Sequence, residues 1–144
     1  MYRTILLACD GSAFSATVLR QGADLANHCK ADLHVLGVVV TTGGMAIAEA
    51  AGSVDVWGAE RQDLQRVMNA AAQELARRGV AVSTEIREGD PAAEIATCAH
   101  EIHADLVVLG HTGKGMLARW FQGSVGASLL DRLPCSLLVA KDGE

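Results

Sequence analysis

The sequence predicts a small α/β domain in which a parallel β-sheet carries helices on both faces. Apolar runs of strand length alternate along the chain with segments whose apolar residues repeat at helical spacing. These runs are nearly continuous in apolar residues, which is typical of strands buried on both faces. Right-handed crossovers then place the intervening helices over the sheet. With 144 residues, we expect a single domain over residues 1–144.

The first strand is expected at Thr4–Cys9, an apolar run that stops at Asp10-Gly11-Ser12. Apolar residues then recur at helical spacing, which predicts a helix from about residue 14 to 29. A second strand is expected at Leu33–Val40. Gly37 inside that strand indicates either a bulge or the close approach of a ligand or helix.

Residues 41–58 contain several glycines among short apolar pieces and are too long for an ordinary strand-to-helix connection. We expect a loop or a short extra helix there, either a plain insertion or a cover for a ligand. A second helix follows, with an apolar stripe from Leu64 to Leu75 and an end at Gly79. The alternation over Val80–Ile86 predicts the third strand.

Asp90-Pro91 marks the start of the next helix, because an acidic cap and proline suit a helical first turn. A fourth strand is predicted at Asp105–Gly110, followed by a glycine-rich stretch. The last helix is expected through Val125, Leu129 and Leu133, and Pro134 ends it before the fifth strand, expected at Ser136–Ala140.

Charge and composition exclude several classes of function. The formal net charge of −5 disfavours a broad contact with nucleic acid or an anionic membrane. No apolar run approaches the ~18 residues that indicate a membrane span, and the start of the chain lacks the pattern of a signal peptide. We therefore expect a cytoplasmic protein with neither nucleic acid nor membrane as a partner. The four scattered cysteines indicate reduced, buried thiols.

The segment after the fourth predicted strand has the chemistry of a phosphate cradle. Gly110 and Gly113 follow this strand, and Gly123-Ser124 opens the last helix. Glycines let backbone N–H groups approach an anion, and a helix start adds free donors and a positive dipole potential. Tight turns alone are the alternative. The spacing fits neither a P-loop nor a dinucleotide-binding fingerprint with its acidic residue.

The pattern Gly110-x2-Gly113-x9-Gly123-Ser124, followed by Pro134-Cys135-Ser136-Leu137-Leu138-Val139, resembles the nucleotide-binding signature of the universal stress protein family. The resemblance spans the chain, because Ile5–Ser12 resembles the family's opening strand and Leu33-His34-Val35 its second strand. It implies a five-stranded parallel sheet in the order 3-2-1-4-5. That order places Asp10 beside Gly110 at a switch point of the sheet.

The resemblance also implies the residues of an ATP site. In ATP-binding members the glycine loop and the helix start hold ribose and phosphates, while an aspartate and a valine flank the base. The positions implied here are Asp10, Val35, Leu109, Gly110, Gly113, Gly123, Ser124 and Val125. Asp10 has the alternative role of a turn or cap, and Val35 that of ordinary strand packing. An Mg²⁺ ion carried with ATP would find oxygen contacts at Ser124 or Thr112.

Binding is better supported than turnover, because a phosphoryl-transfer enzyme needs a positioned base and a charge clamp. We expect an ATP-binding stress-response protein that senses or signals nucleotide state, with little or slow hydrolysis and no catalytic residue set. The alternatives are a nucleotide-independent dimeric interaction module and a slow ATPase or phosphotransfer enzyme. Whether the protein acts as a nucleotide binder or as an interaction module, we expect a downstream protein partner that the sequence does not identify.

Two further expectations concern metal binding and assembly. His100 and His103 lie three residues apart on a predicted helix, but no third ligand is near in the sequence, so surface or packing roles are favoured over a metal site. The implied strand order leaves Ser136–Ala140 at a sheet edge. This apolar strand predicts a homodimer that pairs two such edges.

Overall fold

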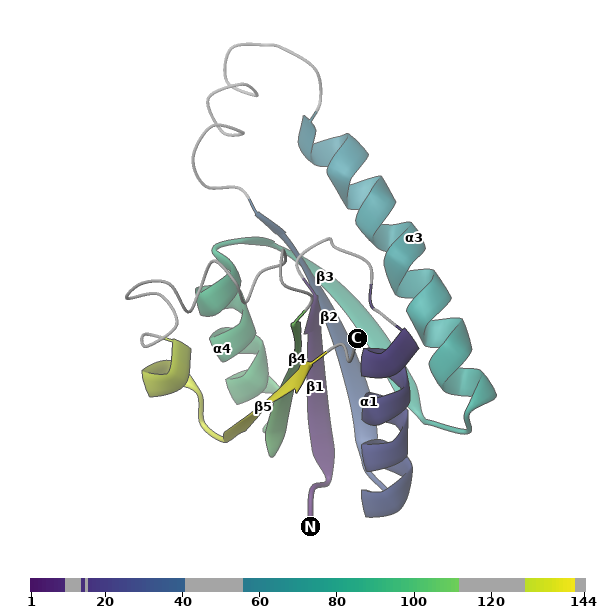
Figure 1. Ribbon diagram of the computed structural model, residues 1–144. Coiled ribbons are helices and arrows are strands. Elements are labelled where there is room, and N and C mark those ends of the chain that lie inside the picture. The colour runs from purple at the N-terminus through teal and green to yellow at the C-terminus, as the bar shows by residue number, and fades with distance from the viewer. Residues whose placement is uncertain (10–13, 15, 41–55, 112–128, 142–144) are drawn as a thin grey trace.

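Five parallel strands form one sheet in the order β3-β2-β1-β4-β5 (Figure 1), which confirms the predicted fold class and strand order. The structure is a computed structural model and describes residues 1–9, 14, 16–40, 56–111 and 129–141. Its elements are β1 (Thr4–Cys9), α1 (Ala16–Cys29), β2 (Asp32–Val40), α3 (Val56–Arg77), β3 (Val82–Gly89), α4 (Pro91–Glu101), β4 (Leu106–His111) and β5 (Ser136–Lys141).

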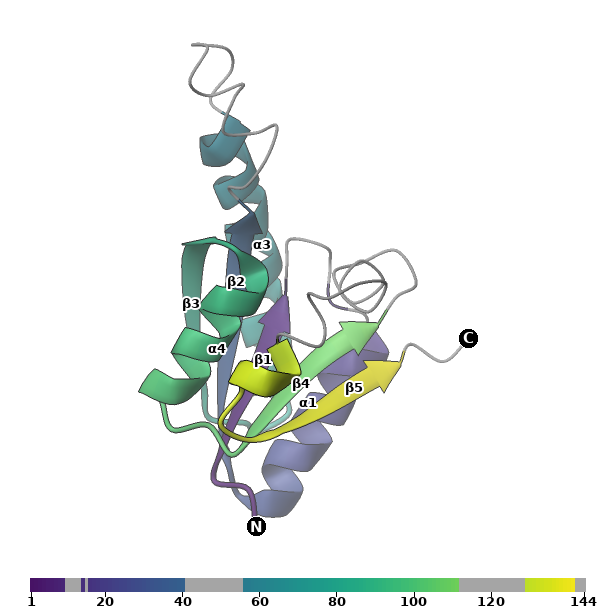
Figure 2. The ribbon, with the colours of Figure 1, turned by 90° about the vertical axis from the view of Figure 1, so that its left-hand side faces the viewer.

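Helices cover both faces of the sheet. Helices α1 and α3 lie on one face, while α4 and the helical residues 129–132 lie on the other (Figures 1 and 2). Each face therefore has its own apolar core, here called the α1/α3 core and the α4 core. Residues 41–55 of the predicted loop lie outside the described residues. The rest of that segment, from Val56, belongs to α3.

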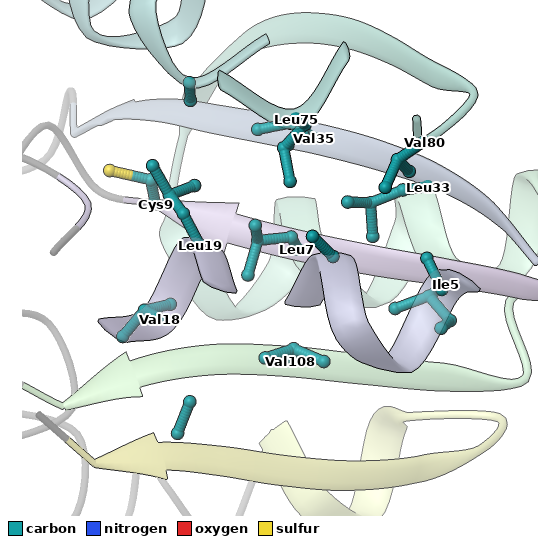
Figure 3. Packing of buried hydrophobic residues seen from close by; sticks show 14 of the residues in the cluster. Ile5, Leu7, Cys9, Val18, Leu19, Leu33, Val35, Leu75, Val80 and Val108 are labelled. Carbon is teal, nitrogen blue, oxygen red and sulfur yellow. The ribbon is translucent and has the colours of Figure 1, made fainter. Parts of the chain in front are cut away.

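The strand β1 contributes to both cores because successive side chains of a strand point to opposite faces. Ile5, Leu7 and Cys9 belong to the α1/α3 core (Figure 3), whereas Leu6 and Ala8 belong to the α4 core. All five residues are buried. This double burial explains why the run is apolar at every position and why it does not alternate.

The start of α4 confirms the interpretation of Asp90-Pro91. Asp90 adopts an extended backbone conformation, and its carboxylate accepts a hydrogen bond from the N–H of Ala93 at 3.0 Å. Pro91 occupies the first helical position, where its missing N–H leaves no intrahelical bond unmade. Ile95 and Ala99 then turn inward from α4 to the sheet.

Gly37 marks the close approach of a helix. It keeps a regular register with Cys9 of β1 and Ile86 of β3, so the strand carries no bulge there. A Cβ atom at Gly37 would lie 2.9 Å from a methyl carbon of Leu64 in α3. Of the alternatives drawn from the sequence, the structure supports approach by a helix.

The predicted boundaries of the third strand were wrong. Strand β3 runs from Val82 to Gly89, two residues later at its start and three later at its end than the sequence indicated. Residues 87–89 look unlike a buried strand because they are charged or glycine. They pair with Val38–Val40 because β3 is an edge strand, where polar side chains keep contact with water.

Two other boundaries shift for local reasons. Phe14 lies before α1, which begins at Ala16, and packs partly buried against the α1/α3 core. Asp105 precedes β4 and is not part of it. Its carboxylate accepts hydrogen bonds from the backbone N–H groups of Arg3 and Thr4, at 2.8 and 3.0 Å. These bonds join the amino ends of β1 and β4.

Replacing Gly37 with alanine should destabilise the protein by about 1–3 kcal/mol, because the added methyl group would overpack against buried Leu64. Urea unfolding measures this free energy. The matched control is Gly22→Ala in α1, where a Cβ would lie 3.7 Å from Leu7. That control should stabilise the helix by about 0.5–1 kcal/mol. Equal stability of Gly37→Ala and wild type would contradict the close approach.

Replacing Asp105 with alanine should lower the melting temperature at neutral pH. Hydrogen bonds from the backbone of Arg3 and Thr4 hold the pKa of Asp105 below its ordinary value of 3.8. A carboxyl group with a depressed pKa in the folded state stabilises the fold above its unfolded pKa. That contribution disappears as the pH falls through the folded pKa.

The difference in melting temperature between wild type and Asp105→Ala should therefore narrow in acid, when both are followed by circular dichroism from pH 7 downward. Asp105→Asn keeps one acceptor oxygen, so its loss at neutral pH should be smaller, and its gap from wild type should narrow in acid as well. A gap that stays constant through acid pH would show that the carboxylate charge is not what joins these strands.

Candidate functional site

The crossovers of the sheet diverge between β1 and β4. The connection from β1 to β2 passes through α1 on one face, and the connection from β3 to β4 passes through α4 on the opposite face (Figure 2). Adjacent strands whose crossovers leave to opposite faces open a crevice at their carboxyl ends, where open α/β sheets bind ligands. The register places Ala8 of β1 beside Leu109 of β4 at this point.

Three of the eight predicted binding residues lie in the described part of the chain. These are Val35, Leu109 and Gly110. The other five lie outside the described residues, directly after β1 or in the segment that follows β4: Asp10, Gly113, Gly123, Ser124 and Val125.

Val35 and Leu109 present their side chains to opposite faces of the sheet. Val35 pairs with Leu7, two residues before the end of β1, and its fully buried side chain belongs to the α1/α3 core (Figure 3). The equally buried side chain of Leu109 belongs to the α4 core. The structure therefore does not bring these two side chains together, and both pack in the interior of the protein.

Gly110 lies at the expected end of β4 and is partly buried. A Cβ atom there would lie 3.1 and 3.3 Å from the two methyl carbons of Val18 in α1. The missing side chain lets α1 approach the carboxyl end of β4. Gly110 thus has a packing role that any contact with a ligand would add to.

A second group of polar residues lies between α4 and the strands β2 and β3. In β2, His34 places its Nε2 atom 3.0 Å from Oε1 of Glu85 and its Nδ1 atom 2.8 Å from Oγ of Ser83. The Sγ atom of Cys98 in α4 lies 3.8 Å from the same Oε1 atom. The Nε atom of Arg87 donates to the other carboxylate oxygen of Glu85 at 2.7 Å.

Electrostatics in this group follow from burial and pairing. Burial raises the pKa of Glu85, but hydrogen bonds from Arg87 and His34 outweigh it, so the pKa lies below its ordinary value. Hydrogen bonds to Glu101 and Glu85 raise the pKa of Arg87, which stays charged. Burial raises the pKa of the Cys98 thiol to about 11, so the thiol is protonated at neutral pH.

Sequence patterns did not reveal this group, although they drew attention to His100 and His103. His100 contacts the backbone carbonyl oxygen of Arg132 at 3.1 Å, and His103 lies beyond the end of α4 with φ of 54°. Among the described residues, the metal-ligand group that has three members is instead His34, Glu85 and Cys98. One sequence signal for this group existed: the period-2 alternation of a strand puts His34 on the same face as Leu36. Its partner Glu85 could be identified only from the register of β2 with β3.

A comparison with family models identifies the chain. Residues 1–141 match the model of the universal stress protein family. The chain belongs to that family. Among curated relatives, a universal stress protein of Methanocaldococcus jannaschii is 31% identical over 144 residues, which cover 98% of this chain and 83% of the relative.

Solved universal stress proteins share the fold. One, described in complex with cAMP, is 24% identical with a TM-score of 0.64, and the match covers 97% of each chain. Another, from Archaeoglobus fulgidus in complex with dAMP, is 18% identical with a TM-score of 0.68, and the match covers 96% of this chain and 97% of that one. The bound nucleotides are findings about those two proteins. Of the helices in the described part of this universal stress protein, none is long and apolar enough to cross a membrane.

Proposed function

We propose that this universal stress protein binds an adenine nucleotide at the carboxyl ends of β1 and β4 and reports nucleotide state through that binding. The observation that carries the proposal is the divergence of the crossovers between these two strands, with the glycine-rich segment following β4. Binding of cAMP and dAMP by two proteins of the same fold supports an adenine nucleotide as the ligand class.

ATP, accompanied by Mg²⁺, is the nucleotide we propose. Gly110, Gly113 and Gly123 would admit phosphate and ribose, and Ser124 would supply a hydroxyl group at the start of the last helix. Asp10 directly follows β1 in the sequence and would contact the nucleoside. The resemblance also nominates Val35, Leu109 and Val125. Because the side chains of Val35 and Leu109 are buried in opposite cores, these two residues would border the nucleotide through their backbone groups.

Binding with little or slow hydrolysis is the proposed activity, because Asp10 is the one acidic residue that the sequence puts near the glycine segment at a strand end. A nucleotide-independent interaction module is the alternative. Mass spectrometry of small molecules released from freshly purified protein distinguishes the two, and chromatography of ADP formed over hours tests for turnover. The cytoplasmic location and the downstream protein partner stay predictions.

A homodimer through β5 is the proposed assembly. Both β3 and β5 are edge strands in the described sheet, but they differ in side chains. β3 carries Glu85, Arg87 and Glu88, and charges of this kind protect an edge from pairing. β5 has an apolar centre, and its Val139 side chain is 40% exposed. Pairing two β5 edges about a twofold axis would cover that side chain and satisfy the free backbone groups.

Replacing Gly113 with valine should weaken ATP binding at least about 10-fold, or about 1.4 kcal/mol, because a branched side chain would occupy space that the phosphates or ribose need. Asp10→Ala should lower the affinity in the same direction. Isothermal titration calorimetry with MgATP measures both. The control Asp32→Ala removes an exposed carboxylate at the amino end of β2 and should bind like wild type.

Folded Gly113→Val protein that binds ATP as tightly as wild type would place the nucleotide elsewhere. A large drop in melting temperature for Asp10→Ala, with unchanged affinity in the folded fraction, would assign Asp10 to a structural role.

Replacing Val139 with lysine should convert dimers into monomers, since two ammonium groups would then face each other near the twofold axis. Light scattering over a range of protein concentrations measures the mass. The matched control is Thr84→Lys, at an exposed position of the opposite edge strand, which should remain dimeric. Wild-type protein that is monomeric at every concentration would refute the dimer.

A further inference from the structure

We propose that His34, Glu85 and Cys98 form a binding site for a divalent transition-metal ion of the zinc class. The three side chains come from three different elements, β2, β3 and α4, and meet beneath α4. Each offers one ligand atom, and these atoms all lie within 4.8 Å of one another. The site is separate from the proposed nucleotide site, which lies at the carboxyl ends of β1 and β4.

The spacing of the ligand atoms suits tetrahedral coordination. With zinc–nitrogen and zinc–oxygen distances of about 2.0 Å and a zinc–sulfur distance of about 2.3 Å, neighbouring ligands of a tetrahedron lie about 3.3–3.6 Å apart. Here Oε1 of Glu85 lies 3.0 Å from Nε2 of His34 and 3.8 Å from Sγ of Cys98. Shifts of a few tenths of an ångström would bring these two pairs to tetrahedral spacing. The third pair, Nε2 of His34 and Sγ of Cys98, lies within 4.8 Å and would close by up to about 1.3 Å around one ion. The exposed fractions of the His34 and Glu85 side chains, 18% and 34%, leave room for water as the fourth ligand.

The ligand types select the class of ion. A thiolate and an imidazole favour zinc and similar transition metals, whereas magnesium and calcium prefer ligand sets made of oxygen. Coordination requires the Cys98 thiolate, so binding the ion releases one proton to solvent. A site built from these atoms therefore discriminates against the Mg²⁺ that would accompany ATP.

Charge also favours a dication. With Cys98 ionised, three negative groups surround the single guanidinium of Arg87, namely Cys98, Glu85 and Glu101. A divalent ion brings this cluster to neutrality. Arg87 contacts Oε2 of Glu85 and leaves Oε1 directed at His34 and Cys98, so it orients the carboxylate without occupying the ligand position.

Ser83 completes the outer shell of the site. Its hydroxyl lies 2.8 Å from Nδ1 of His34, and a hydroxyl can both donate and accept. Without an ion, Nε2–H donates to Glu85 and Nδ1 accepts from Ser83. With an ion, Nδ1–H donates to Ser83, which frees the Nε2 lone pair for the metal. Such outer-shell partners hold a ligating histidine in the required tautomer.

Titration of the full-length protein with Co²⁺ tests the proposal, because a thiolate bound to cobalt gives an intense charge-transfer band in the near ultraviolet. We expect this band to saturate at one equivalent and to be displaced by Zn²⁺, under a reductant that lacks thiols. Cys98→Ser should abolish the band, and His34→Gln should weaken binding strongly. Ser83→Ala leaves the three ligands in place and should lower the affinity about 10-fold.

The matched control is the double variant His28→Gln, Cys29→Ser. It removes a histidine and a cysteine that are adjacent in the sequence at the end of α1 and are not part of the proposed site. It should bind cobalt like wild type. Circular dichroism establishes that each variant folds, and His34→Gln, at a partly exposed side chain, provides the test if Cys98→Ser does not fold. Absence of the band in wild type, its survival in Cys98→Ser, or its loss in the control would overturn the proposal.

Discussion

Burial of the central strands on both faces is the constraint on which the rest of this structure depends. β1 and β4 place apolar side chains alternately into the α1/α3 core and the α4 core, so helices must cover both faces. With right-handed crossovers, covering both faces requires that the chain change direction somewhere along the sheet. That change falls between β1 and β4, at the kind of switch point where open α/β sheets bind ligands. The location of the proposed nucleotide site thus follows from the packing of the core.

The sequence predicted the architecture well where a local signal and a tertiary requirement agree. Asp90-Pro91 marks the start of α4 through capping chemistry that operates within a few residues. The sequence missed the end of β3 because its last residues are charged or glycine. They belong to the strand only because they pair with β2 at the edge of the sheet. Gly37 shows the same limit: the sequence signalled a special position, but Leu64 of α3 decides which explanation holds.

The two candidate sites were predictable to different degrees. The glycine-rich segment after β4 is contiguous in sequence, so the spacing of its glycines is by itself informative about the ligand. His34, Glu85 and Cys98 come together only when the register of β2 with β3 is set and α4 packs over both strands. Their separation along the chain, with no short repeated spacing, hides the group from motif analysis.

The polar group of His34, Glu85 and Arg87 lies where α4 covers the edge strand β3 and its neighbour β2. In β3 the side chains on the α4 side include Glu85 and Arg87, which remain partly exposed, while the more central β1 contributes Leu6 and Ala8 to the same face. Burying a carboxylate or an imidazole costs free energy unless each finds a partner. Here His34, Glu85 and Arg87 supply partners for one another across β2 and β3. The edge of the sheet therefore hosts polar chemistry that the central strands exclude.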